Sequence, residues 1–239
     1  MSVHFHRQLE KLKRLILSVG AMVEESVAGA VRAIETRDVE LAQSVIQGDE
    51  SVDLKEIEVE EECLATLALH QPVAHDLRFI VAVLKMNNDL ERIGDLARSI
   101  AEQAVHLAEA PPMREFEQFG IYEMARLAQT MLKQSLDSLV ELDVDLAKVV
   151  RKTDDDVDDR HKAVYAYVER RVMESPEQIS RMIRLLTIAR SLERVADHAV
   201  NIAKDVIYLV DGKIVRHRGA QKRARKAAEA LDDGGAESA

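Results

Sequence analysis

The chain has few of the residues that form disulfides, favour strands or mark tight turns. Its one cysteine, Cys63, excludes any disulfide within the chain, and we interpret it as a small, partly buried helix residue. There is no tryptophan, aromatic residues make up 3%, and 239 residues include only 9 glycines and 4 prolines. This composition disfavours sheets and predicts long helices with short connections.

Long apolar runs are also missing. No stretch approaches the roughly 20 apolar residues that a membrane-spanning helix needs, and the first residues lack the apolar segment of a signal peptide. We therefore expect a cytoplasmic protein without a membrane span. The formal net charge of −10 disfavours nucleic acid as a partner, because a nucleic-acid-binding protein needs a basic surface.

What the sequence does contain is a set of patterns written twice. The segment Asp89–Asp95 (DLERIGD) is similar to Ser191–Asp197 (SLERVAD), which lies 102 positions later. The segment Asp38–Ala42 (DVELA) returns as Asp143–Ala147 (DVDLA), 105 positions later. A repeat of this length indicates a duplicated domain rather than a solenoid of short units.

Each half is predicted to contain three antiparallel helices. The first helices are expected at about residues 4–35 and 114–141. Asp38 and Asp143 stand before the apolar-periodic segments that follow, where an aspartate is a good N-cap for the second helices.

The third helices are expected to begin near Pro72 and Pro176, because proline is favoured in a first helical turn. The segment Ser175–Gln178 fits a capping box with Ser175 as N-cap. We predict an all-α protein of two tandem antiparallel three-helix bundles. The expected domains are residues 1–112 and 113–218, followed by a mobile charged tail at 219–239.

Both copies of the repeated pattern carry a glutamate four positions before an aspartate. Because residues i and i+4 share a helix face, Glu91 points the same way as Asp95, and Glu193 the same way as Asp197. Like charges at this spacing destabilise a helix by roughly 0.2–0.5 kcal/mol, and a bound cation would offset that repulsion.

The second helices carry matching aspartate pairs. Asp53 lies as many residues before Pro72 as Glu91 lies after it, so the two should lie at the same height in an antiparallel pair. The counts around Pro176 are nearly equal as well. The sequence thus predicts two metal sites of four carboxylates each, formed by Asp49, Asp53, Glu91 and Asp95 in the first half and by Asp154, Asp158, Glu193 and Asp197 in the second.

Clustered carboxylate oxygens suit hard cations, so we expect divalent or trivalent Mg, Mn, Ca or Fe ions, or Zn held without thiolates. Residues expected to orient the ligands are Asn88, Arg92, Arg194 and His198. The alternative is a solvated acidic face that binds no metal. We assign no catalytic residue, because the sequence lacks a Gly-rich phosphate loop, a Gly-x-Ser-x-Gly elbow, a Cys–His pairing and the Glu-x-x-His pairs of di-iron bundles.

Four segments resemble the PhoU family of phosphate-uptake regulators: Gln71–Arg78, Asn88–Asp95, Leu192–Ala203 and Tyr208–His217. The resemblance runs from about residue 5 to 217, and the family's doubled Glu/Asp-x-x-x-Asp motif falls on Glu91–Asp95 and Glu193–Asp197. Three departures stand out: Ala196 replaces a common glycine, Lys204 replaces a common acid, and Leu96 follows the first motif where the family has histidine. None of them removes a predicted ligand.

The resemblance implies two three-helix bundles with multinuclear metal sites in a non-enzymatic cytoplasmic regulator. Such a protein represses the phosphate-starvation response by coupling the ATPase of a Pst-type phosphate ABC transporter to a PhoR-type sensor histidine kinase. It also implies a homodimer. The alternatives are a metal-dependent enzyme in a carboxylate bundle, a structural helical adaptor, and an accessory of another phosphate transporter.

Overall fold

The computed structural model describes residues 3–212, and within that range the chain is helical with no strand. The prediction of an all-α helical bundle is confirmed. The helices are α1 (Val3–Thr36), α2 (Val39–His70), α3 (Ala74–Ala108), α4 (Glu115–Gln118), α5 (Ile121–Glu141), α6 (Val144–Glu174) and α7 (Ile179–Asp211), with a 3-10 turn, η1 (Pro176–Gln178), before α7.

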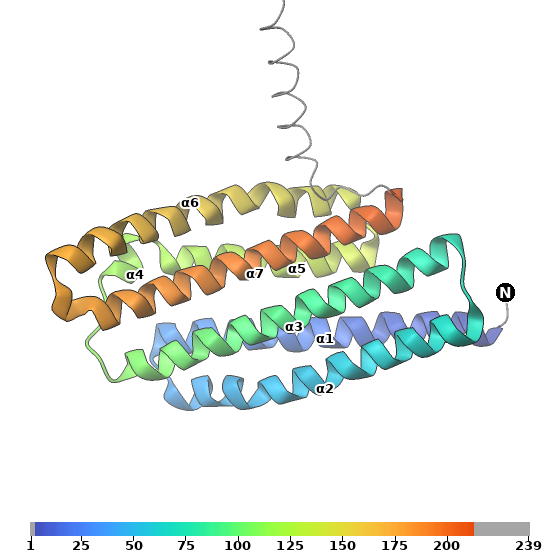
Figure 1. The fold of residues 1–239 in the computed structure, drawn as a ribbon, viewed down its shortest axis with the longest axis horizontal. Coiled ribbons are helices and arrows are strands. Elements are labelled where there is room, and N and C mark those ends of the chain that lie inside the picture. The colour runs from blue at the N-terminus through green and yellow to red at the C-terminus, as the bar shows by residue number, and fades with distance from the viewer. Residues whose placement is uncertain (1–2, 213–239) are drawn as a thin grey trace, which may run out of the picture.

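The helices form two sets that lie side by side (Figure 1). Helices α1, α2 and α3 pack against one another in the first set, and α5, α6 and α7 do so in the second. Helices α3 and α7 run antiparallel along the centre and pack against each other, so they join the two sets. Buried apolar residues from both sets belong to one continuous cluster, which includes Leu12, Ile93, Met131 and Leu192.

Two aspartates start helices as the sequence predicts. The Asp38 side chain accepts a hydrogen bond from the Leu41 backbone N–H at 3.0 Å. The Asp143 side chain accepts from the N–H groups of Asp145 and Leu146 at 2.8 and 3.0 Å. Each carboxylate satisfies donors that the first helical turn leaves without intrahelical partners.

Other helix boundaries differ from the prediction. The segment expected as one helix at 114–141 is broken at Gly120, whose φ of +60° is left-handed and ends the short helix α4 before α5 begins. The capping box at Ser175 does not form, because Ser175 makes no side-chain cap hydrogen bond and Pro176 opens a 3-10 turn instead of α7.

Three further expectations concern burial, the membrane and the C-terminal tail. Cys63 is fully buried, and burial raises the pKa of its thiol to about 12, so the thiol stays protonated. No helix within residues 3–212 is long and apolar enough to span a membrane. The predicted charged tail at 219–239 lies outside the described residues.

Candidate functional site

Asp49 of α2 lies buried where α2 and α3 approach each other closely. The approach favours glycine at position 94, because a Cβ there would lie in tight contact with Val52 Cγ1 at 3.3 Å and would reach Asp49 Oδ1 at 3.5 Å. Arg98, one turn further along α3, donates from Nη1 to Asp49 Oδ2 at 3.3 Å. The first predicted site therefore includes a close approach of α2 to α3 at Gly94.

The four carboxylates of the first half lie within range of one another's charges. Burial raises the pKa of Asp49, the charges of Asp53 and Asp95 raise it further, and Arg98 opposes them. Burial also raises the pKa of Glu91, followed by the charge of Asp95 and then that of Asp53. Because a raised carboxyl pKa means that the charged form is disfavoured, this groove is a place where a cation would be favoured.

The second half repeats this arrangement between α6 and α7. Desolvation raises the pKa of Asp154 to about 6, with the charges of Asp197 and Asp158 adding to the effect. The pKa of Asp197 is raised by desolvation and then by Asp158, and that of Glu193 by desolvation and then by Asp197. Lys204, at a position where an acid is common in the resembling family, lowers the pKa of both Asp154 and Asp197.

The carboxylates do not converge on one point. In the part of the chain that the structure describes, no three His, Cys, Asp or Glu side chains are placed to hold one metal ion. Arg92 lies 3.2 Å from both Glu91 Oε2 and Asp95 Oδ2 and holds both side chains. The donors fit a hard cation in kind, because they are carboxylate oxygens. In the first half, binding one requires Glu91 and Asp95 to leave Arg92, and Asp49 to leave Arg98.

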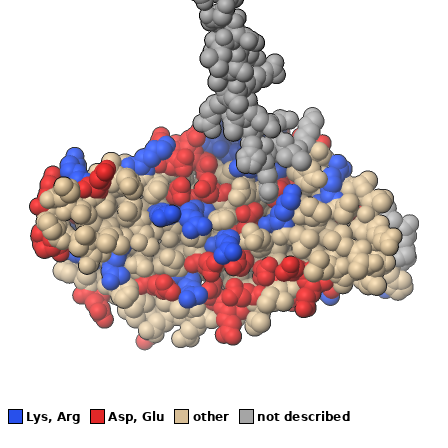
Figure 2. Space-filling model, viewed as in Figure 1, with Lys and Arg blue, Asp and Glu red and all other residues tan. Residues whose placement is uncertain are grey.

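Acidic side chains gather on one face of the molecule over α2 and α3 and again over α6 and α7, with basic side chains between them over α3 and α7 (Figure 2). The predicted orienting residues fall in this region, but only some contact a ligand. Arg92 pairs with Glu91 and Asp95, and Arg194 acts on Asp197 through its charge. Asn88 is exposed, and no contact of its side chain with a predicted ligand is found among the described residues.

His198 links the two helix sets. Its Nδ1 lies 2.8 Å from Oδ1 of the buried Asp89 on α3, and Asn201 Nδ2 donates to the same oxygen at 3.3 Å. Farther along the same α3–α7 interface, Arg184 donates to Gln103 Oε1 at 3.1 Å. The His198 ring therefore contacts Asp89, which is not a predicted ligand, although its charge lowers the pKa of the adjacent Asp197.

Sequence reasoning missed Asn87, which faces α2 in place of Asn88. Asn87 is buried, and its Nδ2 donates to the Glu56 carbonyl at 2.9 Å and to Glu56 Oε1 at 3.1 Å. The signal was present in the spacing, because positions 87, 91, 94 and 98 advance by four, three and four residues along one helix face.

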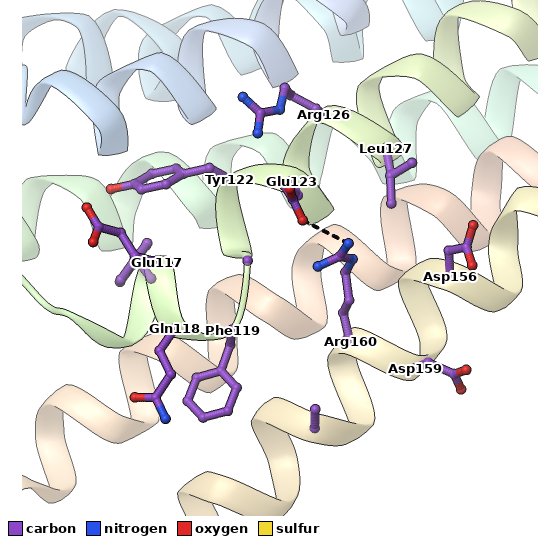
Figure 3. Close-up of a pocket in the computed structure, with 13 residues that line it drawn as sticks. Glu117, Gln118, Phe119, Tyr122, Glu123, Arg126, Leu127, Asp156, Asp159 and Arg160 are labelled. Carbon is purple, nitrogen blue, oxygen red and sulfur yellow. Dashed lines mark ion pairs between the residues drawn. The ribbon is translucent and has the colours of Figure 1, made fainter.

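A hollow of about 910 Å³ lies elsewhere, between the α4–α5 turn and α6, and none of the predicted ligands lines it (Figure 3). Arg160 crosses it and pairs with Glu123 at 2.8 Å. A Cβ at Gly120 would lie 2.5 Å from Arg160 Nη1, so glycine also makes room for this ion pair. The hollow brings together no group of residues typical of catalysis.

Comparison with known proteins places matches over both helix sets. The family model of the PhoU domain matches at residues 16–104 and again at 121–206. The phosphate-specific transport system accessory protein PhoU homolog of Aquifex aeolicus is 38% identical over 217 residues, covering 91% of this chain and 97% of the relative. The homolog from Pseudomonas aeruginosa is 39% identical over 222 residues, covering 92% and 90%.

Two crystal structures have the same fold. The PhoU structure from Pseudomonas aeruginosa has a TM-score of 0.83 and 38% identity, covering 87% of this chain and 100% of that one. The structure of the phosphate transport system regulatory protein PhoU from Streptococcus pneumoniae has a TM-score of 0.78 and 28% identity, covering 88% and 99%.

Proposed function

The chain belongs to the PhoU family, and from this premise we propose that it regulates phosphate uptake as a non-enzymatic accessory of a phosphate transport system. The observation that supports the proposal most directly is the double match to the PhoU domain. One match covers Glu91 and Asp95, and the other covers Glu193 and Asp197. The names of the relatives, which are accessory proteins of phosphate-specific transport, point the same way.

The proposed mechanism is protein–protein regulation. The chain acts in the cytoplasm as a homodimer, contacts the ATPase of a Pst-type phosphate ABC transporter, and couples the transporter's state to a PhoR-type sensor histidine kinase. When phosphate is plentiful, this coupling represses the phosphate-starvation response. Rigid helices about 30 residues long and joined by short turns suit such an adaptor, because they hold separate binding surfaces at fixed distances.

Metal binding at the two acidic grooves is part of the proposal. The carboxylates of Asp49, Asp53, Glu91 and Asp95 would hold a hard cation between α2 and α3, and those of Asp154, Asp158, Glu193 and Asp197 would do so between α6 and α7. A bound cation would supply positive charge that offsets the burial, and the repulsion between neighbouring carboxylates, that raise the pKa values of Asp49 and Asp154. Its role here is structural, because it ties neighbouring helices together and fixes the acidic surface.

The test of the regulatory role is deletion of the gene in its own host, with a reporter of a phosphate-starvation gene. Grown in high phosphate, the deletion strain should express the reporter at the level normally seen in starvation, and the wild-type gene should restore repression. Normal repression in the deletion strain would contradict the proposal. A purified, metal-loaded protein that hydrolysed phosphoesters would instead favour the metal-dependent enzyme.

A further inference from the structure

The outer face of α2 carries apolar side chains that no other helix covers. Leu54 is 64% exposed, Ile57 is 49% exposed and Leu64 is 54% exposed. Their spacing of three and seven residues places them on one side of the helix. Single exposed leucines are common on protein surfaces, but a stripe of them along an outer helix marks an interaction surface.

The duplication supplies an internal comparison for this stripe. The buried positions of α2 recur in α6 with a constant offset of 105, for example Val52 with Val157 and Val59 with Val164. Helix α2 packs against α1 and α3, and α6 packs in the same way against α5 and α7. The two helices therefore stand in equivalent places of the fold, and their outer faces can be compared position by position.

At the equivalent positions α6 is charged. Leu54, Ile57 and Leu64 correspond to Asp159, Lys162 and Glu169, all of which are exposed. The fold therefore does not need apolar residues at these positions, since α6 forms and packs with charged residues there. Apolar side chains at these three positions are therefore a feature of the first half alone.

The charges around the stripe indicate what covers it. Exposed acidic residues lie beside and within it, namely Glu50, Asp53, Glu58, Glu60 and Glu61. Figure 2 shows acidic side chains gathered along α2 at the lower edge of the molecule. A second copy of the chain laid on this face would bring acid against acid, which disfavours association. The complementary partner is an amphipathic helix whose apolar side is flanked by lysine or arginine.

We propose that the outer face of α2, formed by Leu54, Ile57 and Leu64 with the surrounding glutamates, is the docking surface for a basic amphipathic helix of the phosphate transporter's ATPase subunit. This inference rests on the proposed function for the identity of the partner. The apolar stripe provides the buried contact, and the glutamates orient the partner helix and speed its association.

The experiment measures the affinity of the purified ATPase subunit of the cognate phosphate transporter for the full-length protein. The variant Leu54→Ser, Ile57→Ser, Leu64→Ser should bind at least about ten-fold more weakly, because central apolar contacts carry most of an interface's affinity. The matched control on α6, Asp159→Ser, Lys162→Ser, Glu169→Ser, should bind within about two-fold of wild type. All six positions are exposed, so both variants are expected to fold, which circular dichroism checks.

A charge variant provides a second measurement. Glu50→Gln, Glu58→Gln, Glu61→Gln should slow association and flatten its dependence on salt, because steering by exposed charges is screened at high ionic strength. Unchanged affinity in the α2 serine variant would overturn the docking proposal alone. If the wild-type protein did not bind the ATPase subunit at all, that result would contradict both the transporter contact in the proposed function and the docking proposal. A wild-type dimer that the α2 variant dissociates would assign the face to a second copy and overturn the proposal.

Discussion

The carboxylate of Asp89 connects the two helix sets through hydrogen bonds. Asp89 is buried on α3, and its Oδ1 contacts His198 Nδ1 and Asn201 Nδ2, both on α7. A buried carboxylate that loses a hydrogen-bond partner keeps its desolvation cost and loses the interaction that offset it. This cluster is therefore a buried polar contact between the two helix sets.

Replacing His198 tests that contact. His198→Ala should lower the free energy of unfolding by about 1–3 kcal/mol, because Asp89 is left buried with Asn201 as its remaining partner on α7. Urea denaturation of the metal-free protein measures the effect. Asn88→Ala serves as the control. Asn88 precedes Asp89 on α3 but is exposed, so its replacement should change the free energy of unfolding little. Equal stability of the two variants would show that the Asp89 contact contributes nothing.

Asp154 predicts a pH dependence of stability. Its pKa is raised from 3.8 to about 6 in the folded protein, so the folded state takes up the proton more readily than the unfolded state. Its ionised form therefore destabilises the fold above pH 6, and this destabilisation is relieved as the pH falls from 6 towards 3.8. In metal-free protein, Asp154→Asn should be more stable than wild type at pH 7 and should gain less stability on going to pH 5. Urea denaturation at pH 7 and pH 5 measures the free energy of unfolding of both proteins. An equal change between the two pH values in wild type and variant would contradict the raised pKa of Asp154.

At the scale of single helices, two glycines make opposite predictions. Gly48 lies within α2, and a Cβ there would meet nothing within 4 Å. Gly48→Ala should therefore stabilise the protein by about 0.5–1 kcal/mol, because alanine restricts the unfolded chain and favours helix. Gly120→Ala should destabilise by about 1 kcal/mol or more, because φ is +60° and Arg160 occupies the space. Thermal unfolding compares the two variants, and a shift of the same sign in both would refute this account of the α4–α5 break.

The elements also show which features of the fold could be predicted from the sequence. Asp38 and Asp143 were identified as caps because a cap needs only one side chain and the backbone beside it. The heights of Asp53 and Glu91 followed from counting residues to the turn, since antiparallel helices have the same rise per residue. The break at Gly120 was missed because a single glycine can continue a helix or adopt the left-handed conformation seen here, and the periodicity of the segment does not distinguish the two.

The candidate site was predicted less completely. The eight carboxylates could be grouped from their spacing, but side-chain direction depends on contacts across the groove. Arg92 pairs with Asp95 at the i,i+3 spacing of a single helix, which the sequence shows, but the pairing of Arg98 with Asp49 crosses from α3 to α2 and does not follow from spacing alone. Asn88 was predicted to orient a ligand, but it is exposed, and the neighbouring Asn87 contacts α2 instead, because one residue along a helix turns a side chain by about 100°.

At the scale of the whole molecule, the two helix sets should unfold together. Helices α3 and α7 join the sets, and buried apolar residues from both belong to one cluster. All four tyrosines, Tyr122, Tyr165, Tyr167 and Tyr208, lie in the second half, whereas far-ultraviolet circular dichroism reports helices of both halves. Unfolding in urea should give coincident transitions by tyrosine fluorescence and by circular dichroism. Separate midpoints would show that the halves are independent units.

The central claim is that the duplicated carboxylates form two cation sites in one regulator of phosphate uptake. Anomalous scattering from crystals grown with Mn²⁺, collected on both sides of the manganese absorption edge, tests it most directly. The account predicts anomalous peaks within coordination distance of the Asp49–Asp53–Glu91–Asp95 group and of the Asp154–Asp158–Glu193–Asp197 group, with the second peak lost in Asp197→Asn. Crystals in which neither group carries an anomalous peak would contradict the account.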